Sequence, residues 1–384
     1  MPGFPPVMPA LPVCEACGGR GEVAPGTGCH VCLRTGVAAV NPDYAAQLAA
    51  FAAAAIPPDP PTPDLYPNAV SGPQYSNSGY PNGATDWMRP EIFGAAPLPI
   101  VDSTTGIQAA LNATPPGGIF YLPRGVWTTT APLIKPSGVE VWGAARSLGI
   151  PTGNFGIGGL PLIGSIIQPA AGFAGSSAWF MTDDGVHQAG GGGFRRISVD
   201  GSQLPGGNAV HGIQSVGAVA AVTLEDVLVW GTGGNGLDAQ KGTGIANPDF
   251  WDVRHSKFSA CGGQGIHTIG LADTTWTVVE STGNNGDNWN VSNGNNSRYL
   301  FCKGENSATG WDWNIFGLTG FTGYAEWLTL SAAGGALGAI QVSGPGTGIF
   351  YFADTHTLGG TVSLTGTNTV KSTPAWTTGS IVTS

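Results

Sequence analysis

The sequence predicts an all-β solenoid, a parallel β-helix, and three observations indicate it. A signature of a polar residue, then Gly or Asn, then a large apolar residue returns at a period of about 25 residues, which is typical of solenoid repeats. Strand-like runs such as 222–229 and 276–279 precede the copies, and no helical pattern follows them. Glycine supplies 63 and proline 30 of the 384 residues, while only 10% are charged. The five copies are His211-Gly212-Ile213, Asn235-Gly236-Leu237, Gln264-Gly265-Ile266, Asp287-Asn288-Trp289 and Thr309-Gly310-Trp311.

Each position of the repeated triplet has an expected role. Gly and Asn enter the left-handed backbone region at low cost, so we expect the middle residue to make the same tight turn in every coil. The apolar residue that follows is expected to point into the core. The polar residue before it is expected to stack on its counterparts in the coils above and below.

Composition and charge exclude several function classes. The net charge is −10 and no basic cluster is present, which argues against binding to nucleic acid or to an anionic membrane. No stretch approaches the roughly 18 apolar residues of a membrane span, so no membrane insertion is expected. Residues 1–13 contain prolines and no basic residue, so we expect no secretory signal and assembly in a cytoplasm.

The first forty residues are expected to form a separate metal-binding module. Cys14, Cys17, Cys29 and Cys32 form two C-x-x-C pairs, and four thiolates at this spacing can close a tetrahedral structural Zn²⁺ site. The alternatives are two disulfides or free cysteines in a tail without structure. Each half resembles the repeat of the DnaJ-type zinc domain, in which glycines follow the cysteine pair; residues 14–21 match it fully and residues 29–36 in part. This resemblance implies metal binding and not chaperone function.

Between the zinc module and the solenoid we expect a short helix and a linker. Asn41 and Pro42 are favoured residues for opening a helix, and the predicted helix covers residues 41–56. Residues 57–99 are rich in proline and glycine and are expected to be an extended linker.

Residues 100–143 carry a family resemblance. An acidic turn at Asp102 precedes residues 106–112 (GIQAALN), then 116–127 (PGGIFYLPRGVW), then 133–143 (LIKPSGVEVWG). This order resembles the opening of pectate-lyase-like right-handed parallel β-helix proteins, including many phage tailspikes. The resemblance implies that the first segment is a capping helix, with Ile107 and Leu111 on one face, that covers the open end of the solenoid. The β-helix is expected over residues 100–330.

Catalytic residues are less well indicated than the fold. An outward column of Glu225, Asp252 and Glu280, with Arg254 and His255 nearby, is the candidate for catalysis by carboxyl groups. The alternative is that these three are ordinary solvated residues on the outside of the solenoid. The sequence leaves open whether the protein is an enzyme, and it favours a protein without catalytic activity.

Tryptophan is frequent in the second half of the chain and suggests a sugar-binding surface. Seven of the twelve tryptophans lie between residues 230 and 327, and exposed indole rings commonly stack on sugars. Trp289 and Trp311 occupy the apolar position of the triplet and are expected in the core, and two or three of the seven are expected to face solvent. Cys261 and Cys302 are expected to be buried as small apolar residues.

Residues 331–384 are expected to form a β-rich cap or an intertwined trimer tip. The resemblance to tail fibres, tailspikes and minor tail proteins implies a virion structural and adhesion protein, assembled in the host cytoplasm as a homotrimer. Its N-terminal module would attach to other tail or capsid proteins, and its β-helix would bind host cell-surface polysaccharide. The alternative is a polysaccharide depolymerase, a lyase or a glycoside hydrolase, on the same scaffold.

Overall fold

A computed structural model describes residues 22–24, 27–28, 87–97, 102–146, 164–182, 189–241, 249–317, 323–328, 330–353, 356–357, 361–372 and 381–383. The chain divides into two compact units, residues 1–61 and 62–384. In the first, β1 (Glu22–Ala24) and β2 (Thr27–Gly28) pair antiparallel. The four cysteines of the predicted zinc site and the predicted helix at 41–56 lie outside the described residues.

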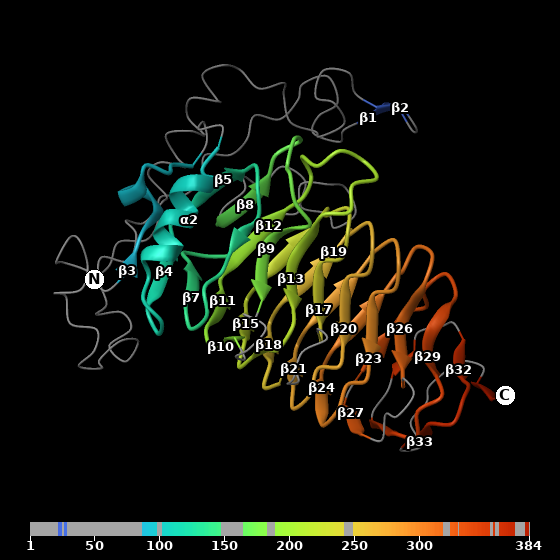
Figure 1. Cartoon of the computed structure of the whole chain (residues 1–384). Helices are drawn as coiled ribbons and strands as arrows, with labels where there is room; N and C mark the ends of the chain where they lie inside the picture. Colours follow the sequence, from blue (N-terminus) through green and yellow to red (C-terminus); the bar gives the residue numbers. More distant parts are fainter. Residues whose placement is uncertain are drawn as a thin grey trace, which may run out of the picture. The chain divides into compact units, whose positions relative to one another are not determined.

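The second unit is a right-handed parallel β-helix (Figure 1). In its described residues the strands form three long parallel sheets of eleven, nine and ten strands, and successive coils add one strand to each sheet. The fold class predicted from the repeat is therefore confirmed.

Sheet 1 contains β3 (Trp87–Met88), β4 (Ile119–Leu122), β7 (Glu140–Gly143), β11 (Gly193–Arg195), β15 (Thr223–Glu225), β18 (Asp252–Arg254), β21 (Thr275–Thr277), β24 (Ser297–Leu300), β27 (Tyr324–Leu328), β30 (Ile349–Ala353) and β33 (Thr369–Ser372). Sheet 2 contains β5 (Gly125–Thr129), β8 (Ser165–Pro169), β12 (Ile197–Asp200), β16 (Leu228–Trp230), β19 (Lys257–Ser259), β22 (Glu280–Thr282), β25 (Lys303–Glu305), β28 (Ser331–Ala332) and β31 (His356–Thr357). Sheet 3 contains β6 (Leu133–Ile134), β9 (Ser177–Thr182), β13 (His211–Val216), β17 (Leu237–Gln240), β20 (Ile266–Ile269), β23 (Trp289–Ser292), β26 (Trp311–Phe316), β29 (Gly338–Ser343), β32 (Val362–Leu364) and β34 (Ile381–Thr383). A short parallel pair, β10 (Ala189–Gly190) and β14 (Val219–Ala220), lies outside these sheets.

Aromatic side chains stack along the core from coil to coil. The rings of Tyr299 and Trp327 are stacked with centroids 4.9 Å apart in sheet 1, and Trp289 and Trp313 are stacked at 4.3 Å in sheet 3. Sheet 2 compensates for their volume, because its inward positions in the same coils are Ser281 and Gly304. A Cβ on Gly304 would lie 2.8 Å from Nε1 of Trp313, so the indole fits only beside a glycine.

The helix α2 (Thr104–Ala113) covers one end of the core, as the resemblance implied. Ile107 and Leu111 are buried on its inner face. On its other side Gln108 accepts a hydrogen bond from the backbone N–H of Ile134 (2.7 Å) and donates one to its carbonyl oxygen (3.0 Å). The side chain therefore satisfies the edge of β6 as a neighbouring strand would.

The ordered part of the β-helix is longer than the sequence predicted. The strand β3 pairs with β4, and the 3₁₀ helix η4 (Pro90–Phe93) contacts α2, so residues 87–97 are not part of an extended linker. At the other end, β28 to β34 continue the three sheets past residue 330. The parallel pairing therefore shows no break at that residue.

The left-handed turns of the coil lie elsewhere than predicted. The middle residues of the triplets, Gly212, Gly236, Gly265, Asn288 and Gly310, do not have positive φ. The glycines among them are needed for space instead: a Cβ on Gly236 would lie 2.6 Å from the carbonyl oxygen of Gly265. At five corners between sheets 1 and 2 one residue takes the left-handed conformation, with φ between 50° and 56°: Arg196, Asp226, His255, Val278 and Phe301.

The fifth triplet is shifted by two residues from the predicted one. Trp289 pairs with Trp313 and not with Trp311, so the fifth copy is Trp311-Asp312-Trp313. The prediction failed because a glycine two residues earlier, Gly310, imitates the pattern. The expected stacking of the polar first residues is confirmed: the backbone N–H of Asn235 donates to Nδ1 of His211 (2.8 Å), and that of Gln264 to Oδ1 of Asn235 (2.9 Å).

Candidate functional site on the outer face of sheet 3

Polar side chains form a continuous row on the outer face of sheet 3. Strand register places Gln214, Asp238, His267, Asn290, Asn314 and Gln341 at equivalent positions of six successive strands, β13 to β29. We call these six residues the polar row. Parallel strands are about 4.8 Å apart, so the row presents one polar side chain per coil at that spacing.

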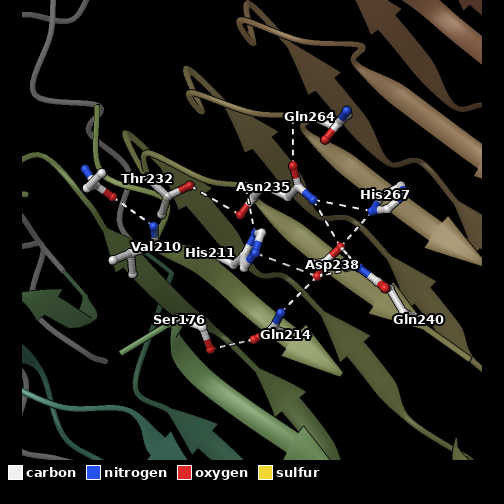
Figure 2. A network of polar contacts seen from close by, with 11 residues as sticks. Ser176, Val210, His211, Gln214, Thr232, Asn235, Asp238, Gln240, Gln264 and His267 are labelled. Atoms are coloured by element: carbon white, nitrogen blue, oxygen red, sulfur yellow. Dashed lines mark hydrogen bonds and ion pairs between the residues drawn. The ribbon is translucent and has the colours of Figure 1, made fainter. Parts of the chain in front are cut away.

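Asp238 organises the first half of the polar row (Figure 2). Its carboxylate accepts hydrogen bonds from Gln214 (3.0 Å), Asn235 (3.0 Å), Gln240 (2.9 Å) and Nδ1 of His267 (2.7 Å). The side chain of Asp238 is only 1% exposed. Burial alone would raise the pKa of this carboxyl, but the hydrogen bonds from His267, Gln240 and Gln214 outweigh it and hold the pKa well below its usual range.

Two histidines flank Asp238 and differ in their orientation. A carboxylate can only accept, so Nδ1 of His267 carries a proton and donates it to Asp238. Nδ1 of His211 accepts the backbone N–H of Asn235, so its Nε2 carries the proton and faces Oδ2 of Asp238 at 3.8 Å. Burial lowers the pKa of His211 and His267 adds to this effect, against the opposing charge of Asp238. His211 is therefore neutral in this network.

Asp287 organises the second half of the polar row. Its Oδ2 accepts hydrogen bonds from Nδ2 of Asn290 and Nδ2 of Asn314, both at 2.9 Å. Its Oδ1 accepts the backbone N–H of Trp311 at 2.7 Å. Asp287 is 9% exposed, so two successive asparagines are held by one nearly buried carboxylate.

Trp311, whose backbone N–H is bonded to Asp287, is the one half-buried tryptophan among the seven between residues 230 and 327. Its ring covers Gly338 of the next coil, where a Cβ would lie 2.2 Å from Cζ3 of the indole. The expectation that Trp311 lies in the core is wrong, and so is the expectation that two or three of the seven face solvent. Trp289 is fully buried, as predicted.

Charged side chains are distributed unequally over the three sheets. No Lys or Arg lies within the described strands of sheet 3. On sheet 1, Arg195 forms ion pairs with Glu140 and Glu225. On sheet 2, Lys303 forms ion pairs with Glu280 (3.3 Å) and Glu305 (2.7 Å). The outer face of sheet 3 therefore differs in chemistry from the other two.

The structure does not bring the three predicted catalytic residues together. Glu225 is in register with Arg254, and Asp252 is in register with Thr223, so the two carboxyl groups lie in different columns of sheet 1. Glu280 belongs to sheet 2, where Lys257 (2.8 Å) and Lys303 neutralise it. The predicted column placed Asp252 one coil after Glu225, whereas strand pairing places Arg254 there, two residues later in the chain.

Two further expectations concern cysteine and metal. Cys261 and Cys302 are buried free thiols, as predicted. Burial raises the pKa of Cys261 to about 11 and that of Cys302 to about 12. Within the described residues, no group of three or more His, Cys, Asp or Glu could hold a metal ion. No helix in the same residues is long and apolar enough to cross a membrane.

Sequence reasoning missed Asp238, His211 and His267 as a cluster. His211 was found only as the first residue of a triplet, and Asp238 was one of many acids outside the strongest pattern. A usable signal was present, because the residue that follows the apolar triplet position is outward and polar in four successive copies: Gln214, Asp238, His267 and Asn290.

Comparison with known proteins agrees with the coil architecture. The profile of the family "Rhamnogalacturonase A/epimerase, pectate lyase-like" matches residues 91–312, more than half of the chain. The chain belongs to this family. None of the curated proteins matches it.

The chain is similar to several solved structures at low sequence identity. The A-module of the mannuronan C-5 epimerase AlgE4 of Azotobacter vinelandii is 16% identical with a TM-score of 0.46, covering 77% of this chain and all 100% of the module. ORF18 of Geobacillus virus E2 is 12% identical with a TM-score of 0.46, covering 78% of this chain and 61% of that protein. The gp42 tailspike of Acinetobacter phage vb_AbaP_AS12 is 13% identical with a TM-score of 0.46, covering 79% and 64%.

Proposed function

We propose that this chain binds polysaccharide through a site made of the polar row and Trp311. We further propose that it serves as a virion adhesion protein, such as a tail fibre, tailspike or minor tail protein. The observation that carries the binding proposal is the arrangement of amides and an imidazole on successive coils, fixed by two nearly buried carboxylates beside a half-buried indole. Membership in a carbohydrate-active family supports the same class of ligand.

The chemistry of the site fits a chain of sugar rings. An indole offers an apolar surface for a sugar ring, and neighbouring amides hydrogen-bond to its hydroxyl groups. Because Asp287 holds Asn290 and Asn314 in place, these side chains lose little conformational freedom when a ligand binds. A row along several coils can contact several rings of one extended glycan.

Binding without cleavage is favoured because the carboxylates are already engaged. A glycoside hydrolase needs two carboxyl groups that face the substrate, one of them protonated. Asp238 is buried, accepts at least four hydrogen bonds and has a lowered pKa, which makes it a poor general acid. Asp287 is bonded to Asn290, Asn314 and the Trp311 backbone.

One observation favours a depolymerase as the second candidate. The 2.7 Å bond from Asp238 to Nδ1 of His267 orients the ring with Nε2 away from the carboxylate, and the side chain is 19% exposed. A histidine held in this way can act as a general base. Product analysis separates the two functions: new reducing ends or unsaturated ends that are lost with His267→Asn would establish the enzyme.

The virion setting rests on the order of the parts along the chain. A small cysteine module and a proline-rich segment precede a long solenoid, an order suited to attachment at one end and adhesion at the other. We propose a structural Zn²⁺ held by Cys14, Cys17, Cys29 and Cys32, attachment to tail or capsid proteins through this module, and a homotrimer.

Zinc at full stoichiometry in a Cys14→Ala/Cys29→Ala protein would refute the metal site. A chain ending near residue 330 that stays fully trimeric in light scattering would refute a C-terminal trimer tip.

Binding to an array of bacterial surface polysaccharides tests the main proposal. We expect the full chain to retain at least one polymer, and Trp311→Ala and Asn314→Ala each to weaken its Kd at least tenfold, or about 1.4 kcal/mol. Phe301→Ala is the matched control, because Phe301 is an exposed aromatic residue at a corner away from sheet 3. No binding to any polymer, or an equal loss in the control, contradicts the proposal.

A further inference from the structure

We infer that the glycan bound by the polar row is uncharged and that its hydroxyl groups donate hydrogen bonds to the protein. This inference rests on the proposed polysaccharide site and specifies its ligand class. It follows from the direction of the hydrogen bonds within the row and from the distribution of charge over the three sheets.

The amide groups of Asn290 and Asn314 in the row, and of Gln240 on the strand of Asp238, are oriented by partners that can only accept. Asp287 receives Nδ2 of Asn290 and Nδ2 of Asn314, and Asp238 receives Nε2 of Gln240. The assignment of nitrogen and oxygen in each amide is therefore fixed by chemistry, because the reversed amide would place two acceptors against each other. Each amide directs a nitrogen to a carboxylate and keeps its carbonyl oxygen for another partner.

The remaining acceptors have no partner within the described part of the chain. No hydrogen bond reaches the carbonyl oxygen of Asn290, Asn314 or Gln240 there. Nε2 of His267 has none either. All four side chains are partly exposed. The face thus offers these acceptors together with the second N–H of each amide, and the hydroxyl groups of an uncharged sugar can both donate to the former and accept from the latter.

The charge of the face opposes an anionic ligand. Asp238 belongs to the row and Asp287 holds two of its members, the pKa of Asp238 is lowered, and the described strands of sheet 3 contain no Lys or Arg. The carboxylate of a uronic acid would be repelled by these like charges, and no cation on the strands of the sheet would offset the repulsion. Sheets 1 and 2, by contrast, carry their cations in ion pairs with Glu140, Glu225, Glu280 and Glu305.

Affinity electrophoresis of the full chain tests this inference with named polymers. Dextran, galactomannan and arabinogalactan are the uncharged probes, and polygalacturonate and alginate are the anionic ones. We expect retention by at least one uncharged polymer, little change in Kd between low and high salt, and no retention by the anionic ones. Asp287→Asn should weaken the Kd for the retained polymer at least tenfold, because the new amide lets Asn290 and Asn314 turn. Glu280→Gln on sheet 2 is the matched control and should change nothing.

A second variant keeps the test decisive if Asp287→Asn does not fold. Gln341 occupies the next position of the row and bonds to neither carboxylate, so Gln341→Lys adds a cation without disturbing the network. It should bring measurable retention by polygalacturonate. Wild-type binding to an anionic polymer that exceeds binding to all uncharged ones, and that is lost in Trp311→Ala, overturns the inference and leaves the proposed function intact. Retention by none of the five polymers together with failure on the bacterial array overturns the proposed function itself.

Discussion

Replacing Asp238 by asparagine should destabilise the protein measurably, although the substitution only replaces one carboxylate oxygen with an NH₂ group. The carboxylate accepts hydrogen bonds from Gln214, Asn235, Gln240 and His267, and its side chain is 1% exposed. An asparagine can accept on one oxygen only, so its NH₂ group faces donors that have no other partner. Hydrogen bonds to a charged group contribute about 1.5–3 kcal/mol each, and a buried donor left unpaired costs about as much. We expect the free energy of unfolding to fall by about 3 kcal/mol.

Urea denaturation at several pH values measures this change. Because the folded pKa of Asp238 is lowered, its carboxylate stabilises the fold above the unfolded value of about 3.9, and this contribution is lost as the pH falls through the folded pKa. Because Asp238 also raises the pKa of His211, the difference between wild type and Asp238→Asn should be constant only where His211 is neutral in both proteins, at about pH 7 to 8, and it should shrink in strong acid as Asp238 is protonated. Asp226→Asn is the control, because its carboxylate is 38% exposed and pairs only with Arg146. A change below about 0.5 kcal/mol for Asp238→Asn would refute the reasoning, since it lies within the range of ordinary surface substitutions.

Three further outcomes are expected. The pKa of His211 is lowered, so its neutral form stabilises the fold and this stability is lost as the pH falls below about 6.5; His211→Gln should flatten the dependence of Tm on pH in that range. Val278 is 48% exposed and has φ of 54°, a backbone conformation that costs a β-branched residue about 1–2 kcal/mol. Val278→Gly should therefore raise the free energy of unfolding by up to about 1 kcal/mol in urea titrations. A lower free energy of unfolding in this variant would contradict the strain. The thiols of Cys261 and Cys302, with pKa raised to about 11 and about 12, should remain unmodified by iodoacetamide at pH 8 in peptide mapping until the protein is denatured.

The fold was predictable from the sequence because small and apolar residues recur with the period of the coil. Gly236 and Gly265 fall where one coil touches the next, and a side chain there would meet backbone or buried groups. Such positions accept few residue types, so they form a pattern that a single sequence reveals. The capping helix was predictable for a similar reason, since Ile107 and Leu111 must both face the core.

The register and the site were harder to predict because the corners of the coil leave no signature. Arg196, Asp226, His255, Val278 and Phe301 share one backbone conformation but no side-chain chemistry. The sequence also does not reveal the length of each coil, so Glu225 and Asp252 were assigned to one column although strand pairing sets Glu225 beside Arg254. The polar row was missed because its members differ in type and become a group only through Asp238 and Asp287, which bind them across coils.

The way in which the coils stack has a consequence for how such a surface can evolve. Each coil contacts only its two neighbours, so inserting or deleting a whole coil lengthens or shortens the sugar-contacting face by about 4.8 Å without changing the rest. The aromatic core restricts where this can happen. The coil of Trp313 has a glycine, Gly304, on sheet 2, where a Cβ would lie 2.8 Å from the indole nitrogen, so a larger side chain cannot share that volume. Variation in length is therefore easiest at the coil whose inward residues are Leu224, Val229 and Leu237, and most constrained around Trp289 and Trp313.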